Sequence, residues 1–138
     1  MESAENQCLI DSSVLIGLLD EEDLFSKKSL EEFEKMRKNN TQAIISDYVL
    51  QETFTVLLYK NKGDRIPSAL DLLRNEPKIT LVDINLKMLI DTVAFAKKQS
   101  FQPKLSLTDW SLAYLSSVTK TPIITFDKQL KNCCKKFT

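Results

Sequence analysis

The chain has 138 residues, of which 43% are hydrophobic and 28% are charged, so its size and composition fit one folded domain and argue against disorder. Lysine plus arginine and aspartate plus glutamate each number 19, which makes the formal net charge zero, so any attraction for nucleic acid must come from local patches. Histidine is absent, which excludes nucleophilic sites that need histidine and the cleavage of RNA by histidine acid–base catalysis.

No apolar run is long enough to cross a membrane, and the polar, acidic start MESAENQ does not resemble a secretory signal. We therefore expect a cytoplasmic protein without a membrane partner. The cysteines are Cys8, Cys133 and Cys134. Two adjacent cysteines do not give a C-x-x-C zinc knuckle, so we expect reduced thiols and a metal site, if any, that is made of oxygen ligands.

Short apolar runs alternate with helical periodicity along the chain. In chain order, the pattern predicts a strand at 7–11, helices at 14–19 and 26–37, a strand at 43–45, a helix from Ser46 to about residue 60, a turn at 61–64, a helix at 66–73, a strand at 79–82, a helix at 86–99, a loop at 100–105, a helix from Ser106 to about residue 118 and a strand at 122–125. The remaining segment, which begins at Asp127, is short and basic.

This alternation is typical of an α/β domain with a mainly parallel sheet. We expect a single domain over residues 1–138, with three layers (α/β/α) and a central sheet of four to five strands. Sheets of this kind bind ligands outside the carboxyl ends of their strands, at the point where the strand order reverses. The carboxyl ends of the predicted strands are therefore the place to look for chemistry.

Two aspartates lie at such ends. Asp11 follows the first apolar run directly, and Asp127 comes two residues after Thr125, which ends the last run. Aspartate is also a favoured helix N-cap, so capping is an equally good interpretation of either residue alone.

Two further acids lie on predicted helices. Asp109 follows Ser106 by three residues, which is the spacing of a capping box, and its helical face continues through small and apolar residues. Glu52 has Tyr48, Val49, Thr55 and Val56 at the neighbouring helical positions, with no lysine or arginine among them. A carboxylate on such a face must reach solvent, find a partner or bind a metal.

If these four acids share one pocket, their charges repel one another. A hard divalent cation relieves this repulsion, and oxygen ligands suit Mg²⁺ or Mn²⁺. Such an ion activates water and stabilises a phosphate under attack. The residues alone therefore suggest metal-dependent hydrolysis, but spacing does not prove that the acids converge.

Three blocks of the sequence, CLIDSSVLIGLLDEED, SDYVLQETFTVL and LSLTDWSLAYLSSVTKTPIITFDKQL, resemble the successive blocks of a PIN domain. Within this family the blocks resemble VapC-like ribonucleases, the toxin half of type II toxin–antitoxin pairs. The resemblance implies a parallel sheet in which the first and fourth strands are adjacent at the centre. It also implies that four acids bind Mg²⁺ or Mn²⁺ and cut RNA, namely Asp11, Glu52, Asp109 and Asp127.

The resemblance has further implications and some departures. It assigns supporting hydrogen bonds in the acidic site to Ser12 and Thr125, and it implies a homodimer and a small antitoxin partner. Many relatives carry another acid where this chain has Gln129, which would weaken a second metal site. Many also have a fifth strand, which here is short, absent or formed by residues 135–137.

The sequence leaves other points open. Lys104, Lys128 and Lys131 are candidates for RNA contacts, although lysines on a solvated surface explain them equally well. The alternative to an enzyme is a non-catalytic PIN-like module that binds RNA or protein. A phosphoacceptor domain fits less well, because Ser13 occupies the second acidic position of the D-x-D motif.

Overall fold

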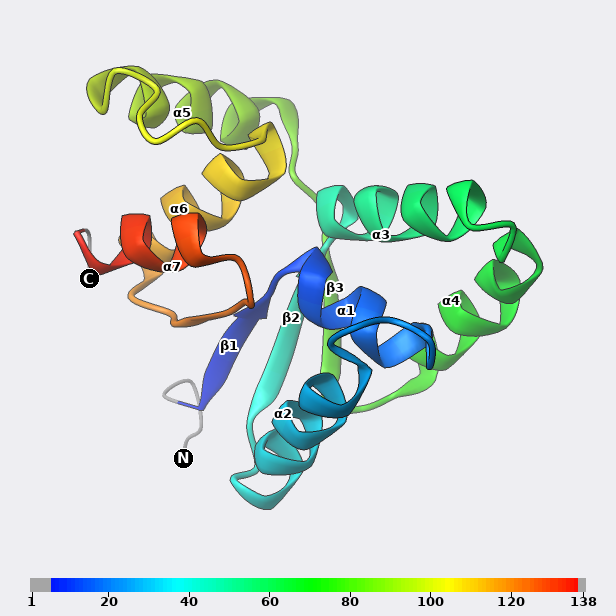
Figure 1. The fold of residues 1–138 in the computed structure, drawn as a ribbon. Coiled ribbons are helices and arrows are strands. Elements are labelled where there is room, and N and C mark those ends of the chain that lie inside the picture. The colour runs from blue at the N-terminus through cyan, green and yellow to red at the C-terminus, as the bar shows by residue number, and fades with distance from the viewer. Residues whose placement is uncertain (1–5, 137–138) are drawn as a thin grey trace.

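The computed structural model describes residues 6–136. In these residues four strands form one sheet in the order β3-β2-β1-β4, and every neighbouring pair is parallel. Leu9 lies between Ile44 of the second strand and Ile123 of the fourth. The prediction of a mainly parallel sheet is confirmed (Figure 1), and the strands are β1 (Gln7–Ile10), β2 (Gln42–Ser46), β3 (Ile79–Val82) and β4 (Ile123–Ile124).

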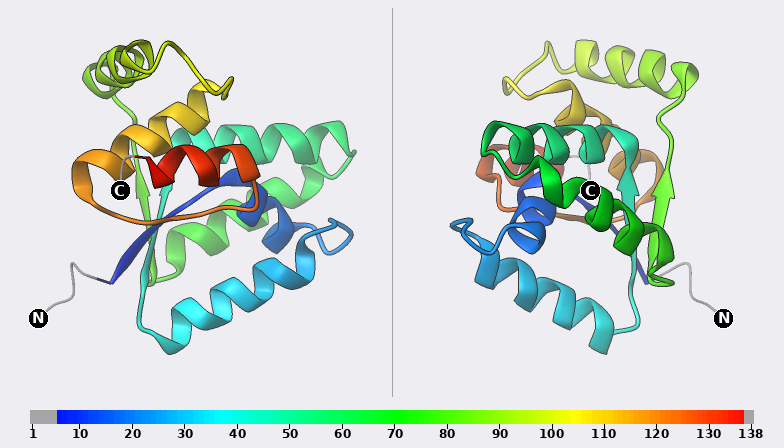
Figure 2. Two further views of the ribbon diagram at one scale, coloured as in Figure 1. Left: turned by 60° about the vertical axis from the view of Figure 1, so that its left-hand side comes forward. Right: turned by 90° about the vertical axis from the view of Figure 1, so that its right-hand side faces the viewer.

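The helices cover both faces of this sheet. The connections from β1 to β2 and from β2 to β3 step in the same direction across the sheet, whereas the connection from β3 to β4 steps back. Right-handed crossovers then place the first four helices on one face and the next two on the other, as Figures 1 and 2 show. The helices are α1 (Ser12–Leu19), α2 (Ser26–Lys38), α3 (Asp47–Tyr59), α4 (Ile66–Asn75), which follows a 3₁₀ turn (Gly63–Arg65), α5 (Leu86–Lys98), α6 (Leu107–Thr119) and α7 (Lys128–Lys135).

Polar residues fix where several helices begin. The side chains of Ser46, Asn85 and Ser106 each accept a hydrogen bond from a backbone N–H in the first turn of α3, α5 and α6, respectively. These bonds satisfy backbone donors that have no partner within the helix. The predicted starts at Ser46 and Ser106 are confirmed. No helix within residues 6–136 is long and apolar enough to cross a membrane.

The end of the chain differs from expectation. Residues 128–135 form α7, the helix that the capping interpretation of Asp127 requires. Of the suggested strand at 135–137, residue 135 is helical and residue 137 lies outside the described residues. The helix forms because Asp127 caps it and because Leu130 and Cys133, three residues apart, are buried. The first and fourth strands are adjacent, but β4 lies at the sheet edge of the described residues and not at its centre.

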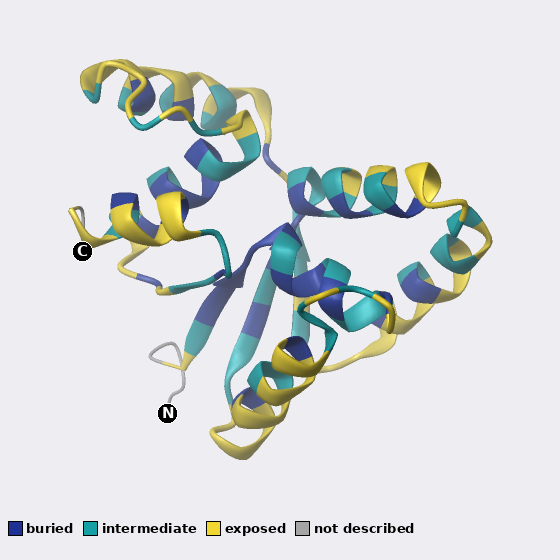
Figure 3. Ribbon diagram, viewed as in Figure 1, coloured by how far each residue is buried: buried dark blue, intermediate teal, exposed yellow. Residues whose placement is uncertain are grey.

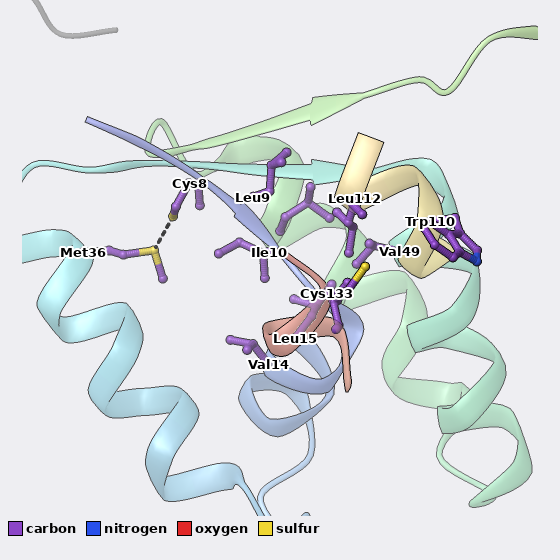
Figure 4. Packing of buried hydrophobic residues seen from close by; sticks show 14 of the residues in the cluster. Cys8, Leu9, Ile10, Val14, Leu15, Met36, Val49, Trp110, Leu112 and Cys133 are labelled. Carbon is purple, nitrogen blue, oxygen red and sulfur yellow. Dashed lines mark hydrogen bonds between the residues drawn. The ribbon is translucent and has the colours of Figure 1, made fainter. Parts of the chain in front are cut away.

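The core lies on both sides of β1 (Figures 3 and 4). Ile10 is fully buried in the middle of this core, and Cys8 donates a hydrogen bond from Sγ to Met36 Sδ over 3.3 Å. Trp110 is also buried and packs edge-on against Phe95. The aromatic side chain next to Asp109 therefore belongs to the core and holds the start of α6 in place.

Helices α1 and α2 pack closely against each other at Gly17. A Cβ atom at this position would lie 2.2 Å from Ser29 Oγ and 2.9 Å from the carbonyl oxygen of Phe25. Ser29 is also constrained, because its hydroxyl donates to the Val14 carbonyl over 2.8 Å. We expect Gly17→Ala to lower the free energy of unfolding by about 2 kcal/mol through overpacking, as measured by urea denaturation.

Gly63→Ala is the matched control. A Cβ atom there would meet only the side chain of Leu58, its closest atom being Cδ2 at 2.7 Å, and this side chain is 60% exposed and therefore able to move aside. We expect this variant to change stability by less than about 0.5 kcal/mol. Equal losses in the two variants would contradict the explanation by helix packing.

Candidate metal centre

Three carboxylates from distant parts of the chain meet above the carboxyl end of β1. Asp11 follows β1 directly, Glu52 lies in the second turn of α3, and Asp109 lies in the first turn of α6. One oxygen atom from each lies within 4.8 Å of the others. We call these three residues the acidic triad.

Asp11 occupies the N-cap position of α1, but its side chain makes no capping hydrogen bond. Its Oδ2 atom instead accepts hydrogen bonds from Thr125 Oγ1 over 2.6 Å and from Ser13 Oγ over 2.8 Å. The residue is 2% exposed, and its Oδ1 atom is buried without a hydrogen-bond partner among the described residues. A buried carboxylate oxygen without a partner is costly, so this atom marks a position that a cation would fit.

Glu52 is half-buried and is held by a hydroxyl group. Ser12 Oγ donates a short hydrogen bond to Glu52 Oε1, and this bond joins the start of α1 to the middle of α3. No ion pair within residues 6–136 involves any residue of the acidic triad. The negative charge of the triad is therefore not balanced by lysine or arginine from this part of the chain.

Asp109 takes part in the hydrogen bonds that cap α6, and its carboxyl group has a raised pKa. Its side chain accepts a hydrogen bond from the Ser106 backbone N–H while its own N–H donates to Ser106 Oγ, which completes the predicted capping box. The pKa of Asp109 is raised from 3.8 to about 6, chiefly by burial and further by the negative charges of Asp11 and Glu52. The hydrogen bonds of the capping box oppose the shift without cancelling it.

The donor set of the triad fits a hard divalent cation. It offers carboxylate oxygens alone, one of them buried without a partner, which is the environment that Mg²⁺ or Mn²⁺ prefers over softer metals. A bound cation would compensate both the repulsion between the carboxylates and the burial of Asp109. The convergence that the sequence could not prove is thus present for three of the four predicted acids.

The fourth acid, Asp127, is not part of this group. Its Oδ1 atom caps α7, where it accepts hydrogen bonds from the N–H groups of Gln129 over 2.9 Å and Leu130 over 3.2 Å. Its own N–H donates to Thr125 Oγ1 over 3.0 Å, and Thr125 in turn donates to Asp11. The structure therefore connects Asp127 to the triad through one threonine, and its role as a metal ligand stays a prediction.

Ser13 is a site residue that the sequence reasoning missed. Its hydroxyl donates to Asp11 Oδ2 and accepts a hydrogen bond from the Phe126 N–H over 3.1 Å, so it holds both the aspartate and the loop after β4. The sequence feature that could have identified Ser13 is its position directly after Asp11 and Ser12, at the start of a helix. Ser13 belongs to the D-S-S segment of the first block that resembles a PIN domain, but that resemblance assigned the supporting hydrogen bonds to Ser12 and Thr125.

The predicted RNA-contacting lysines lie at the surface. Lys104 is exposed in the loop before α6, and Lys128 and Lys131 are exposed on α7 three residues apart. The spacing places the latter two on one side of the helix. Their contact with RNA stays a prediction.

The comparison of family models matches residues 8–136 to the PIN domain. The comparison with curated proteins gave no significant match. Among solved structures, the chain is similar to VapC20 of Mycobacterium tuberculosis, described as a toxin that cleaves the sarcin-ricin loop, with a TM-score of 0.76 and 14% identity over 95% of this chain and 96% of that one.

Two toxin–antitoxin structures show the same fold. VapBC2 of Rickettsia felis, bound to a DNA fragment from its promoter, matches with a TM-score of 0.68 and 15% identity over 92% of each chain. A toxin–antitoxin complex of Klebsiella pneumoniae matches with a TM-score of 0.58 and 20% identity over 88% of each chain.

Proposed function

Because the chain belongs to the PIN domain family, we propose that it is a metal-dependent endoribonuclease that hydrolyses phosphodiester bonds of RNA. The observation that supports this proposal is the acidic triad, with its buried, unpartnered Asp11 Oδ1 atom. The chain has no histidine, so acid–base cleavage by that residue is not an alternative.

The residues of the site divide into ligands and positioning groups. Asp11, Glu52 and Asp109 would hold Mg²⁺ or Mn²⁺, which when bound supplies an activated water and neutralises charge on the phosphate. The hydroxyl groups of Ser12 and Thr125 fix the orientation of Glu52 and Asp11 by donating hydrogen bonds to them. Such bonds to ligand carboxylates keep the site ordered before substrate arrives.

The test is the dependence of cleavage on metal. We expect the purified protein to cut unstructured RNA in Mn²⁺ or Mg²⁺, to lose this activity in EDTA and to regain it when the metal is restored. Calorimetric titration with Mn²⁺ should show binding without RNA. Cleavage that continues unchanged in EDTA would contradict the proposed mechanism.

We also propose that the protein is the toxin of a toxin–antitoxin pair and is inhibited by a small antitoxin. The support is its fold, which it shares with the proteins of two toxin–antitoxin complexes. A short open reading frame beside this gene, whose product binds the protein and inhibits cleavage, is the expected finding.

A homodimer is the oligomeric state that we propose. The outer face of α5 carries Leu86, Ile90 and Val93, which are 71%, 57% and 43% exposed and lie one above the other at helical spacing. Figure 3 shows that much of this helix is exposed. An apolar stripe of this kind supports a contact between two copies of the chain.

One observation supports a second candidate, the non-catalytic module. Asp127 caps a helix and Gln129 replaces an acid, so the site has fewer carboxylates than the resemblance led us to expect. A module of this kind would bind RNA without cutting it in any divalent metal. The titration and cleavage experiment above separates the two candidates.

A further inference from the structure

A shallow trough of about 540 Å³ lies along α3, next to the acidic triad. Glu52 belongs to its wall as well as to the triad. We define the α3 trough by its other lining residues, which are Tyr48, Gln51, Thr55, Val56 and Tyr59 of α3 and Leu107 and Thr108 of α6.

The helical spacing explains how the trough is built. Residues 48, 52, 55 and 59 follow one another by three or four positions, so their side chains form one continuous face of α3. Thr108, on the opposite wall, directly precedes Asp109 in α6. A molecule that lies in the trough is therefore in contact with two elements that carry metal-ligand candidates.

The chemistry of the trough suits nucleobases better than phosphates. Its lining contains no lysine or arginine, so it lacks the charges that usually contact a phosphate backbone. It does contain two tyrosine rings, one of which, Tyr59, is 86% exposed. Aromatic rings at a nucleic-acid site stack on unpaired bases.

Polar groups in the trough are free to bind such bases. The side chains of Gln51 and Thr55 are exposed and make no hydrogen bond to the part of the chain that the structure describes. The side-chain amide of Gln51 offers both donors and an acceptor, and these match the edges of bases. The combination of rings and unpaired polar groups favours an unstacked RNA strand over a buried protein surface.

We propose that the α3 trough binds unpaired nucleotides next to the bond that is cut, through their bases. This inference rests on the proposed function, because it takes the acidic triad as the place of cleavage. It assigns the recognition of bases to the rings of Tyr48 and Tyr59, which line the trough.

The experiment measures RNA binding in EDTA, where cleavage does not interfere. We would follow the fluorescence anisotropy of a labelled, unstructured RNA decamer with wild type, Tyr59→Leu and Tyr48→Leu. Each substitution should weaken binding about tenfold, because the loss of a stacking ring costs this much or more per base. Tyr48→Phe and Tyr59→Phe keep the rings and should bind within about threefold of wild type.

Two controls isolate the role of the bases. A decamer of the same length that lacks bases should bind wild type and the leucine variants with equal affinity, because only its backbone remains. Phe101→Leu removes a ring that is 50% exposed and lies outside the trough, and this variant should bind RNA as wild type does. Thermal melting verifies that each variant is folded.

The outcomes separate this inference from the proposed function. If wild type cuts RNA in Mn²⁺ and the leucine variants bind and cut equally well, the trough inference is wrong and the nuclease assignment stands. If the variants lose RNA affinity but wild type never cuts, recognition stands and the nuclease assignment is wrong. Failure of wild type to bind RNA in EDTA would overturn the trough inference, whereas cleavage in Mn²⁺ decides the nuclease assignment separately.

A further outcome tests a protein occupant. Sedimentation of wild type and Tyr59→Leu gives the oligomeric state of each. A change from dimer to monomer with no change in RNA affinity would show that the trough is a contact between two copies, and it would overturn the inference.

Discussion

Replacing Asp11 with asparagine is expected to lower the rate of RNA cleavage by more than about 100-fold, because the loss of groups that merely support metal ligands already costs 10–100-fold. The substitution removes the charge of the most buried member of the acidic triad. The asparagine oxygen can still accept the hydrogen bonds that Thr125 and Ser13 donate to Asp11 Oδ2. The loss should therefore come from metal binding and not from misfolding.

Two measurements distinguish these causes. Calorimetric titration should show a much weaker affinity of Asp11→Asn for Mn²⁺. Without metal, the thermal midpoint of this variant should equal or exceed that of wild type, because the repulsion between Asp11, Glu52 and Asp109 is reduced. Saturating Mn²⁺ should stabilise wild type by about 2.7 kcal/mol at 100 times the dissociation constant, but not the variant.

Asp83→Asn provides the matched control. Asp83 directly follows β3 but is exposed and lies outside the acidic triad, so its loss should leave both metal affinity and cleavage unchanged. Cleavage by Asp11→Asn at the wild-type rate would remove Asp11 from the mechanism. A similar loss in Asp83→Asn would show that the effect is not specific to the triad.

The sequence predicted the sheet because each strand is a short apolar run and helical periodicity fills each segment between two strands. The sequence also predicted the environment of Glu52, because helical spacing shows which residues lie beside it on the helix surface. The convergence of Asp11, Glu52 and Asp109 could not follow from spacing, because it depends on how α3 and α6 pack across the sheet end. Local rules place a residue on a face, and tertiary packing decides which faces meet.

Asp11 and Asp127 show where local rules reach their limit. Both lie at the carboxyl end of a strand and both precede a helix, so the capping and metal-binding interpretations apply equally to each. In the structure, Asp127 caps α7, whereas Asp11 makes no capping bond. The partners of the two carboxylates differ, because the hydroxyl groups of Thr125 and Ser13 donate to Asp11, whereas backbone N–H groups of α7 donate to Asp127.

The second large effect concerns stability and Asp20, which follows the end of α1 and is not part of the acidic triad. The Asp20 side chain is fully buried, and its oxygens lie 2.6 Å from Lys62 Nζ, 3.1 Å from Lys60 Nζ and 3.8 Å from Arg65 Nη1. It also accepts a hydrogen bond from the Glu22 N–H over 3.1 Å. One carboxylate thus ties the loop after α1 to the end of α3 and the turn that follows.

We expect Asp20→Ala to lower the free energy of unfolding by about 3 kcal/mol, as measured by urea denaturation at pH 7. Removing one partner from a buried ion pair costs about 3–5 kcal/mol. The lower end applies here because the Lys60 side chain is 39% exposed and that of Lys62 is 17% exposed, so water solvates part of their charge. Asp71→Ala, at an exposed position of α4, is the control and should change stability by less than about 0.5 kcal/mol.

The pH dependence of this effect separates the charge of Asp20 from its packing. The pKa of Asp20 is lowered from 3.8 to about 2, chiefly by the hydrogen bond from Lys62. Burial opposes this shift, and the hydrogen bonds from the Glu22 backbone N–H and from Lys60 add to it. Because the folded state has the lower pKa, the unfolded chain takes up the proton first as the pH falls. The stability that the charge contributes, about 2 kcal/mol from this shift, is present above pH 4 and is lost as the pH falls towards 2. The difference in the free energy of unfolding between wild type and Asp20→Ala should therefore be constant above pH 5 and shrink below pH 4. A difference that does not depend on pH would show that packing, not charge, holds this loop.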